Sequence, residues 1–185
     1  MSLIDILLSR RSIRRFENKE VPKDVLDRIL EAGRQSPSAA NRQPYHFILL
    51  TDPEIKKKLS GGMFNRFIQH SHATIVGCAN TGAILTGKWS IVDTTIALQN
   101  MVIAAWALGV GSCWIGDFKE EEVKHLLRIP NGWDVVALIS FGYPAEHPEQ
   151  KKQKIHRGNS ELQQVLNTCL APAARTTKAE GARAS

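Results

Sequence analysis

The sequence predicts one mixed domain in which helices and strands alternate along the chain. Its 185 residues, of which 43% are hydrophobic, suit one soluble domain with its own core. Apolar residues recur every three to four positions in some segments and form short continuous runs in others, which are the patterns of helices and buried strands. No apolar run reaches the roughly 20 residues of a spanning helix, and Asp5 interrupts the first apolar stretch. We therefore expect a cytoplasmic protein without a membrane role.

The first two helices are predicted from their start signals. Ser2 and Asp5 form a capping box, with Asp in place of Glu, around a helical stripe made of Leu3, Ile4, Leu7 and Leu8. This helix is expected to end at the arginines that begin at position 10. Pro22 suits the first turn of a second helix, which is expected to end near residues 33–36.

A polar loop and three short elements are predicted next. Residues 36–44 read Ser-Pro-Ser-Ala-Ala-Asn-Arg-Gln-Pro, and prolines lack a backbone donor and restrict the residue before them. This segment is therefore expected to be a loop. Strands are expected at residues 45–50 and 74–79, with a short helix at residues 53–59.

The longest periodic segment is expected to be a helix that Ser90 and Asp93 open with a second capping signature and that continues to Leu108. From Met101 onward it is apolar on nearly every face, so it must be buried all round. It is either the central helix of the domain or packs against a second subunit. We favour an oligomer, because so small a domain has little protein to surround the helix.

The last third of the chain is predicted to hold two strands, two helices and a tail. The expected elements are a strand entering a turn at residues 111–116, a charged helix at 119–128, a buried strand at 134–140 and a helix at 160–170. The Ala-rich residues 171–185 have too little apolar surface to pack and are expected to be disordered.

Four arginines surround one serine in the segment Arg10-Arg-Ser-Ile-Arg-Arg-Phe16. Guanidinium groups bind phosphate oxygens by paired, charge-assisted hydrogen bonds, and a hydroxyl adds a further donor. The segment predicts a phosphate site, and the alternative is a solvated basic face at a helix end. The net charge of +6 also suggests a nucleic-acid-binding module. However, the charge gathers in residues 10–16 and 151–157 without interleaved aromatic residues, which favours two halves of one phosphate pocket and no nucleic acid.

The cysteines and histidines do not predict a metal site. Cys78, Cys113 and Cys169 are far apart and in apolar surroundings, which favours buried, reduced thiols. His70 and His72 have suggestive spacing, but no third ligand accompanies them.

The order of four segments resembles the nitroreductase family of flavin mononucleotide (FMN) enzymes. They are the arginine segment, the 36–44 loop, the long helix running into Gly111-Ser-Cys-Trp-Ile-Gly116, and Gly142-Tyr-Pro144. The resemblance covers residues 1–170. It implies an α+β sandwich, with a central, mostly antiparallel sheet flanked by helices, and a homodimer that holds FMN at the subunit interface.

The resemblance assigns the arginine segment to the flavin phosphate and ring. Arg10 and Ser12 match the residues that hold the phosphate. Arg14 matches a basic residue near the pyrimidine edge of the ring, where a cation stabilises the reduced, anionic form. Arg11 is expected in the same pocket, and its alternative is simple solvent exposure.

The loop formed by Pro37, Ser38, Ala39 and Asn41 resembles the segment that lines the flavin from the other subunit. Gln43 and Asn41 offer amide groups to the ring or ribitol, although an amide in such a loop can instead satisfy the loop's own backbone.

The remaining flavin contacts are expected at the end of the 111–116 strand and in the chain before His70. Trp114, Ile115 and Gly116 match the segment facing the redox-active edge, where glycine lets an N–H approach flavin N5. Trp114 could equally be core. Asn65 lies near the position of a further contact.

Two departures from the family pattern affect the site. Residues 151–157 lack the usual Arg-Lys-Pro-Leu pattern, and Lys154 and Arg157 are our choices for the closing cations. Only about ten residues separate the strand ending near Asn80 from Ser90, too few for covering helices, so an open cleft is expected. The alternative is that the C-terminal segment or tail covers the opening.

The resemblance implies a ping-pong reaction in which NADH or NADPH transfers hydride to flavin N5, followed by reduction of a small nitroaromatic, quinone or similar electron-poor acceptor. No side chain is assigned as catalytic acid or base, because the cofactor carries the hard step. The alternatives are a flavin-binding protein of this fold without NAD(P)H turnover and the basic nucleic-acid-binding module. The sequence fixes neither the acceptor nor the nicotinamide.

Overall fold

A computed structural model describes residues 2–85 and 87–145. The elements follow the order α1 (Leu3–Ser9), α2 (Lys23–Arg34), η1 (Ala39–Asn41), β1 (Tyr45–Leu50), α3 (Pro53–Leu59), η2 (Arg66–His70), β2 (Ala73–Asn80), α4 (Gly87–Ala107), β3 (Gly111–Ile115), α5 (Glu120–Leu127) and β4 (Trp133–Gly142). The expected helix at residues 160–170 and the tail at 171–185 lie outside the described residues.

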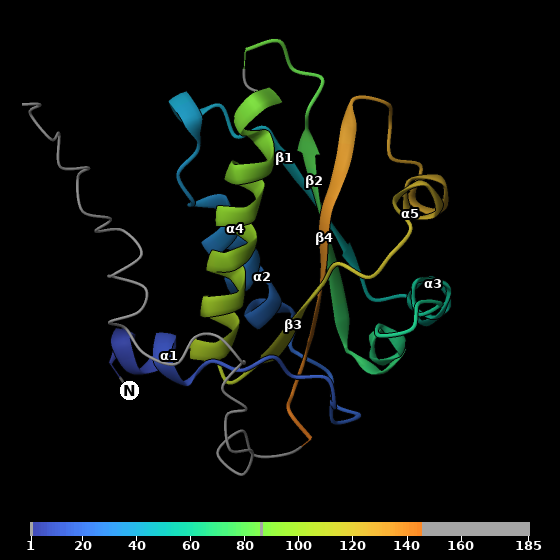
Figure 1. Cartoon of the computed structure of the whole chain (residues 1–185). Coiled ribbons are helices and arrows are strands. Elements are labelled where there is room, and N and C mark those ends of the chain that lie inside the picture. Colours follow the sequence, from blue (N-terminus) through green and yellow to red (C-terminus); the bar gives the residue numbers. More distant parts are fainter. Residues whose placement is uncertain (1, 86, 146–185) are drawn as a thin grey trace, which may run out of the picture. The chain divides into compact units, whose positions relative to one another are not determined.

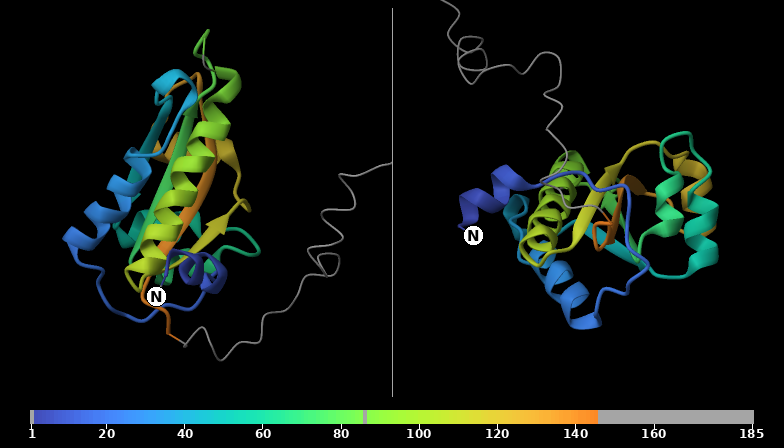
Figure 2. Two further views of the ribbon diagram at one scale, coloured as in Figure 1. Left: turned by 90° about the vertical axis from the view of Figure 1, so that its left-hand side faces the viewer. Right: turned by 90° about the horizontal axis from the view of Figure 1, so that it is seen from below.

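A four-stranded sheet forms the centre of the fold, with strand order β1-β2-β4-β3 and antiparallel pairing throughout. Helices α4 and α2 cover one face, and α3, η2 and α5 lie beyond the other face (Figures 1 and 2). The predicted architecture, a central antiparallel sheet flanked by helices, is confirmed.

Two apolar cores lie on the two faces of this sheet. Ile75 belongs to the core beneath α2 and α4, whereas its neighbour Val76 belongs to the core beneath α3 and α5. This follows because successive side chains of a strand point to opposite faces. Strand β2 is therefore buried on both faces, which explains why its sequence is a continuous apolar run.

The long helix α4 lies very close to β2. A Cβ atom added at Gly77 would stand 2.5 Å from Cδ1 of Leu98, so glycine is required where the helix crosses the strand. Leu98 and Met101 are completely buried in the core on this face. Truncating Leu98 to Ala would remove a large part of this contact, at a cost of about 2–5 kcal/mol.

Most predicted boundaries agree with the structure. The Ser2 hydroxyl accepts from the Asp5 amide and the Asp5 carboxylate accepts from the Ser2 amide, so the capping box of α1 is confirmed. Strand β1 and helix α3 have the predicted bounds. The short helices η1 and η2 were not predicted, because each is a single tight turn without an apolar period.

The predicted capping signature of the long helix is wrong. Helix α4 begins at Gly87, so Ser90 and Asp93 lie inside it. The Ser90 hydroxyl donates to the carbonyl of Gly87, and the Asp93 carboxylate accepts from the amide of Ala39 in a distant loop. Ser90 and Asp93 therefore make contacts from inside the helix and do not cap its beginning.

The environment of α4 also differs from the expectation of burial all round from position 101. Met101, Val102 and Ala105 are buried in the core of their own chain, while Ile103 and Trp106 are half-buried. The exposed large apolar side chains of α4 lie in its first half, and α1 exposes four more; they are Trp89, Ile91, Val92, Ile96, Leu3, Ile4, Leu7 and Leu8. The exposed apolar surface available to a partner is therefore that of α1 and of the first half of α4.

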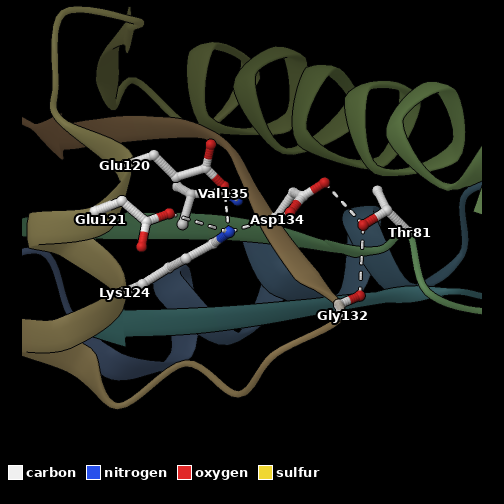
Figure 3. Close-up of polar contacts among 7 residues, drawn as sticks. All are labelled: Thr81, Glu120, Glu121, Lys124, Gly132, Asp134 and Val135. Carbon is white, nitrogen blue, oxygen red and sulfur yellow. Dashed lines mark hydrogen bonds and ion pairs between the residues drawn. The ribbon is translucent and has the colours of Figure 1, made fainter.

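A polar network on the second face ties α5 to β4 and to the turn after β2 (Figure 3). The Lys124 ammonium lies 2.9 Å from Glu120 and 3.1 Å from Asp134. Asp134 also accepts from the Thr81 hydroxyl at 2.7 Å, and Glu120 accepts from the amide of Val135 at 2.9 Å. The hydrogen bonds from Thr81 and Lys124 hold the pKa of Asp134 below its ordinary value.

This network predicts an acid-sensitive contribution to stability. The folded-state pKa of Asp134 is lowered from 3.8, so its stabilisation is present above the unfolded-state pKa and is lost as the pH falls through the folded-state pKa. Replacing Asp134 with Asn should lower the free energy of unfolding by about 1 kcal/mol near neutral pH, a value discounted for the exposure of the side chain. Urea unfolding across a pH series measures this, and a difference that stays constant from about pH 7 to about pH 3 would contradict it.

Candidate functional site

The arginine segment is fixed against the first half of β3. Ser12 pairs with Ser112 in a parallel bridge, and the Ile13 amide donates to the Ser112 carbonyl at 2.8 Å. A Cβ atom added at Gly111 would stand 2.7 Å from Ile13, so glycine permits this close approach. Farther along, Phe16 pairs with Pro144 at the end of β4. The segment therefore has a defined course across two strands.

Arg10 and Ser12, predicted to hold the phosphate, and Arg14, predicted beside the pyrimidine edge, all influence the Cys113 thiol of β3. Burial raises the pKa of the Cys113 thiol, while the charges of Arg14 and Arg10 and a hydrogen bond from Ser12 act in the opposite direction. The bridge between Ser12 and Ser112 places the arginine segment beside this part of β3. The Arg10 guanidinium and the Ser12 hydroxyl are donors suited to a phosphate.

Arg11 has a different environment from its neighbours. Its Nη1 donates to the carbonyl of Leu8 at 3.0 Å and to that of Arg10 at 2.9 Å. These contacts satisfy carbonyl groups at the end of α1, where a cation also interacts favourably with the helix dipole. They supply a structural role for Arg11, and its predicted flavin contact stays a prediction.

Asn65 lies at the other end of β3. It is 1% exposed, and its Nδ2 donates to the carbonyl of Leu59 at 3.0 Å and to that of Asp117 at 2.8 Å. The Asp117 carboxylate accepts in turn from the amide of Phe64 at 2.8 Å. With about 3.3 Å per residue, Ser112 and Asp117 lie about 16 Å apart along the chain. The predicted contacts at positions 10–14 and 65 thus border the two ends of one strand.

Between these ends, Trp114 and Ile115 have clear packing roles. The Trp114 indole donates to Oε1 of Gln99 on α4 at 3.1 Å and packs against the core beneath that helix. Ile115 is buried in the opposite core. Gly116 differs, because a Cβ added there would meet no atom within 4 Å, so its backbone borders open space.

The 36–44 loop is a strained turn held by α4. Three non-glycine residues have left-handed backbones, with φ of 51° at Ala40, 53° at Asn41 and 50° at Gln43. Both oxygens of Asp93 accept from the Ala39 amide at 3.1 Å. Pro37, Asn41 and Gln43 are exposed, and Ser38 is half-buried.

The loop also satisfies part of its own polar inventory. The Ser38 hydroxyl accepts from the Gln43 amide at 2.9 Å, and Nε2 of Gln43 contacts Oδ1 of Asn41 at 3.4 Å. The first contact uses the backbone N–H of Gln43, and the second joins its side-chain amide to another side chain of the loop and not to the loop's backbone. The long second contact still leaves both exposed side chains able to meet a ligand.

One chain holds the loop and the arginine segment at different levels of α4. The loop contacts Asp93, whereas Trp106 donates from its indole to the Ser9 hydroxyl just before the arginines. These helix positions lie about 20 Å apart along the axis, and Figure 1 shows α1 near the end of α4 opposite to the loop before β1. The predicted site residues therefore fall into two groups within one chain.

Two cavities lie near the site. The larger, of about 1180 Å³, includes Arg14 together with Lys19, Lys56 and His72 in its lining. Lys56 is 5% exposed and donates to the carbonyls of Ser71 and His72, and burial lowers its pKa. The smaller, of about 230 Å³, is lined by residues that include Asn65, Asp117 and Gly62.

Several site-bordering residues were not predicted. Asp93 is a lone acidic residue within an apolar helix, a signal that was attributed to capping. Asp117 follows Gly116 directly and had no motif of its own. The other predicted cations, Lys154 and Arg157, lie outside the described residues.

Within the part of the chain that the structure describes, no group of three His, Cys, Asp or Glu residues could hold a metal ion. No helix in this part is long and apolar enough to cross a membrane.

Comparison with known proteins identifies relatives over most of the chain. The model of the family described as the nitroreductase family matches residues 7–75 and 86–143. A protein of Methanothermobacter thermautotrophicus, named as a candidate NADH dehydrogenase/NAD(P)H nitroreductase, is 32% identical over 154 residues, 80% of each chain. FMN reductase (NADPH) of Bacillus subtilis is 26% identical over 85% of this chain and 73% of its own. The structure of an FMN-dependent nitroreductase from Clostridium difficile is 30% identical, with a TM-score of 0.69 over 84% of this chain and 99% of that chain.

The strained turn predicts a stabilising substitution. Replacing Ala40 with Gly should raise the free energy of unfolding by about 0.5–1 kcal/mol, because glycine adopts the left-handed backbone without a Cβ clash, an effect partly offset in the unfolded chain. The matched control is Ala104→Gly within α4, which should lower stability by about 1 kcal/mol. Urea unfolding of both variants is the measurement, and destabilisation by Ala40→Gly would show that position 40 carries no strain.

Proposed function

Because the chain belongs to the nitroreductase family, we propose that it is an FMN-dependent NAD(P)H oxidoreductase. The observation that carries this proposal is the pairing of the arginine segment with β3 through Ser12 and Ser112, at one end of a strand whose other end borders Asn65. The FMN named for the relatives in Bacillus subtilis and Clostridium difficile supports the cofactor.

The residues along β3 fit this cofactor. Oδ1 of Asn65 and Oγ of Ser112 are buried without a hydrogen-bond partner, and among the described residues they are the only such side-chain atoms. Buried polar atoms without partners are rare in folded proteins. One lies at each end of β3, and between them Gly116 leaves its backbone open to an approaching group.

Each residue has a role that follows from its chemistry. Arg10 and Ser12 would hold the FMN phosphate, because guanidinium and hydroxyl donors match its oxygens. Arg14 would provide a fixed positive charge beside the pyrimidine edge, which favours the reduced, anionic ring. The Gly116 amide would approach the redox-active edge, and the partner's 36–44 loop would line the opposite side.

Bound FMN supplies hydride and electron transfer from NADH or NADPH to a small electron-poor acceptor such as a nitroaromatic compound or a quinone. The chain binds and orients the reactants, and no side chain is assigned as nucleophile, acid or base. Among residues 81–85, which follow β2, Ile84 and Leu85 are exposed. The expectation of an open cleft rests on the short connection between β2 and α4, and the cytoplasmic location likewise stays a prediction.

A homodimer completes the proposed site. The loop and the arginine segment of one chain lie about 20 Å apart along α4. A second copy can bring its loop to the first copy's β3. The exposed apolar side chains of α1 and of the first half of α4 supply the surface that such a dimer would bury.

Anaerobic reduction tests the proposed activity. The purified protein should contain FMN, and NADH or NADPH should bleach its visible absorbance in the absence of oxygen. Addition of a quinone should then restore the absorbance. Flavin that no nicotinamide reduces would favour a flavin-binding protein without turnover, and a protein without flavin affinity would contradict the proposal.

The phosphate contacts predict a direct effect on cofactor affinity. Replacing Arg10 with Ala should raise the FMN dissociation constant ten- to a hundredfold, because a charge-assisted hydrogen bond contributes about 1.5–3 kcal/mol. Ser12→Ala should have a smaller effect in the same direction. Arg28→Ala, at an exposed arginine of α2, is the control and should leave the affinity unchanged. Fluorescence titration of the apoprotein measures all three, and unchanged affinity in the Arg10 and Ser12 variants would identify the segment as a solvated basic face.

The apolar face of α4 predicts a charge-sensitive dimer. Replacing Ile96 with Glu should yield a monomer with weakened FMN binding, because a buried, unpaired carboxylate is costly. Leu49→Glu on β1 is a matched control, since both side chains belong to residues that are 37% exposed. Sedimentation at equal protein concentration measures the assembly, and a stable Ile96→Glu dimer would exclude this face as the interface.

A further inference from the structure

The strained turn at residues 38–43 is anchored on both sides while its tip is exposed. Its left-handed residues Ala40, Asn41 and Gln43 would relax in a flexible loop, because such backbones are unfavourable for residues other than glycine. At its far end the Pro44 carbonyl accepts from the Asn80 amide at 2.9 Å. The surrounding contacts therefore keep the turn in one conformation.

Helix α4 supplies the contacts at the near end. Asp93 and Asn100 are seven residues apart, which places them on one face of the helix. Asp93 accepts from the Ala39 amide, and Nδ2 of Asn100 donates to the Ser36 hydroxyl at 2.7 Å. The helix thus fixes Ala39 near the start of the turn and Ser36 just before the turn.

Burying the Asp93 carboxylate to hold a loop costs free energy of hydration. Asp93 is 4% exposed, and a buried carboxylate loses its hydration unless other groups replace it. Its charge also acts on Tyr45, whose pKa is raised by burial and by Asp93. An apolar side chain at position 93 would suit the surrounding core better but could not hold the Ala39 amide.

We propose that Asp93 is a positioning residue for the cofactor, which holds the 38–43 turn in the one conformation that can line FMN bound to the partner subunit. The inference rests on the proposed FMN-binding function. The carboxylate does not touch the cofactor. It fixes the Ala39 amide, the turn continues in its left-handed conformation, and the exposed Asn41 and Gln43 side chains keep their direction. Rigid placement lowers the ordering cost of binding.

The test compares cofactor affinity with stability in a set of variants. Asp93→Ala should raise the FMN dissociation constant at least tenfold in fluorescence titrations of the full-length apoprotein. Asp93→Asn keeps an acceptor oxygen of the same shape and should stay within threefold of wild type. If Asp93→Asn binds FMN as weakly as Asp93→Ala does, the proposal is overturned. The acceptor for the Ala39 amide would then be present without restoring FMN affinity.

Asp134→Ala is the control for stability alone. Asp134 also accepts side-chain hydrogen bonds, but from Thr81 and Lys124 in the network beneath α5. Its replacement should lower the urea midpoint of the apoprotein and leave the FMN dissociation constant within twofold. If Asp134→Ala weakens FMN binding as much as Asp93→Ala at a matched loss of stability, the positioning role is excluded.

Ser38→Ala provides a second test should Asp93→Ala fail to fold. It removes only the hydroxyl that accepts from the Gln43 amide within the turn. We expect the FMN dissociation constant to rise at least threefold with an unchanged urea midpoint, and unchanged affinity would overturn the proposal.

The proposed function and the positioning role fail in different ways. If wild-type protein does not bind FMN, the function itself is wrong. If Arg10→Ala loses FMN while Asp93→Ala and Ser38→Ala bind it as wild type does, only the positioning role is wrong.

Discussion

The packing of α4 on β2 positions three parts of the proposed site. Leu98 can sit directly above Gly77 because that strand position has no side chain, and this contact brings the helix against the sheet. From this position α4 holds Trp114 through Gln99, the 36–44 loop through Asp93, and the N-terminal chain through Trp106. A substitution at Gly77 would displace three separate groups of residues at once. The contact between Leu98 and Gly77 in the core therefore affects the position of residues near the surface.

The β3 strand gives the proposed cofactor site its direction. The arginine segment pairs with β3 at Ser112, and the side-chain amide of Asn65 donates to the Asp117 carbonyl beyond the other end of the strand. Such separation suits a ligand with an anionic end and a polar ring at the other end. The strand is fixed by β4 on one side and by the Ser12 bridge on the other. The site thus depends on backbone pairing more than on long, adaptable side chains.

Local patterns in the sequence predicted an element well where interactions between residues close in sequence determine it. The capping box at Ser2 and the apolar run of β2 are examples, since capping bonds and burial on both faces act locally. Asp93 shows the limit, because a polar residue that serves a loop 54 positions away has the same appearance as a helix cap. The family resemblance selected Arg10, Ser12 and Arg14, and the structure pairs the segment that holds them with β3. It could not reveal that Arg11 turns to the end of α1 or that the Asn65 amide is already bonded to Asp117.

The two cysteines in the described residues bear on the chemical durability of the protein. Both are free and buried, burial raises the pKa of Cys78 to about 11, and burial also raises that of Cys113. Nucleophilic attack by cysteine requires the thiolate, which a raised pKa disfavours. Quinones are electrophiles that alkylate thiolates as well as accepting electrons. A quinone that reaches the protein would therefore react slowly with Cys78 and Cys113, because both thiols are buried.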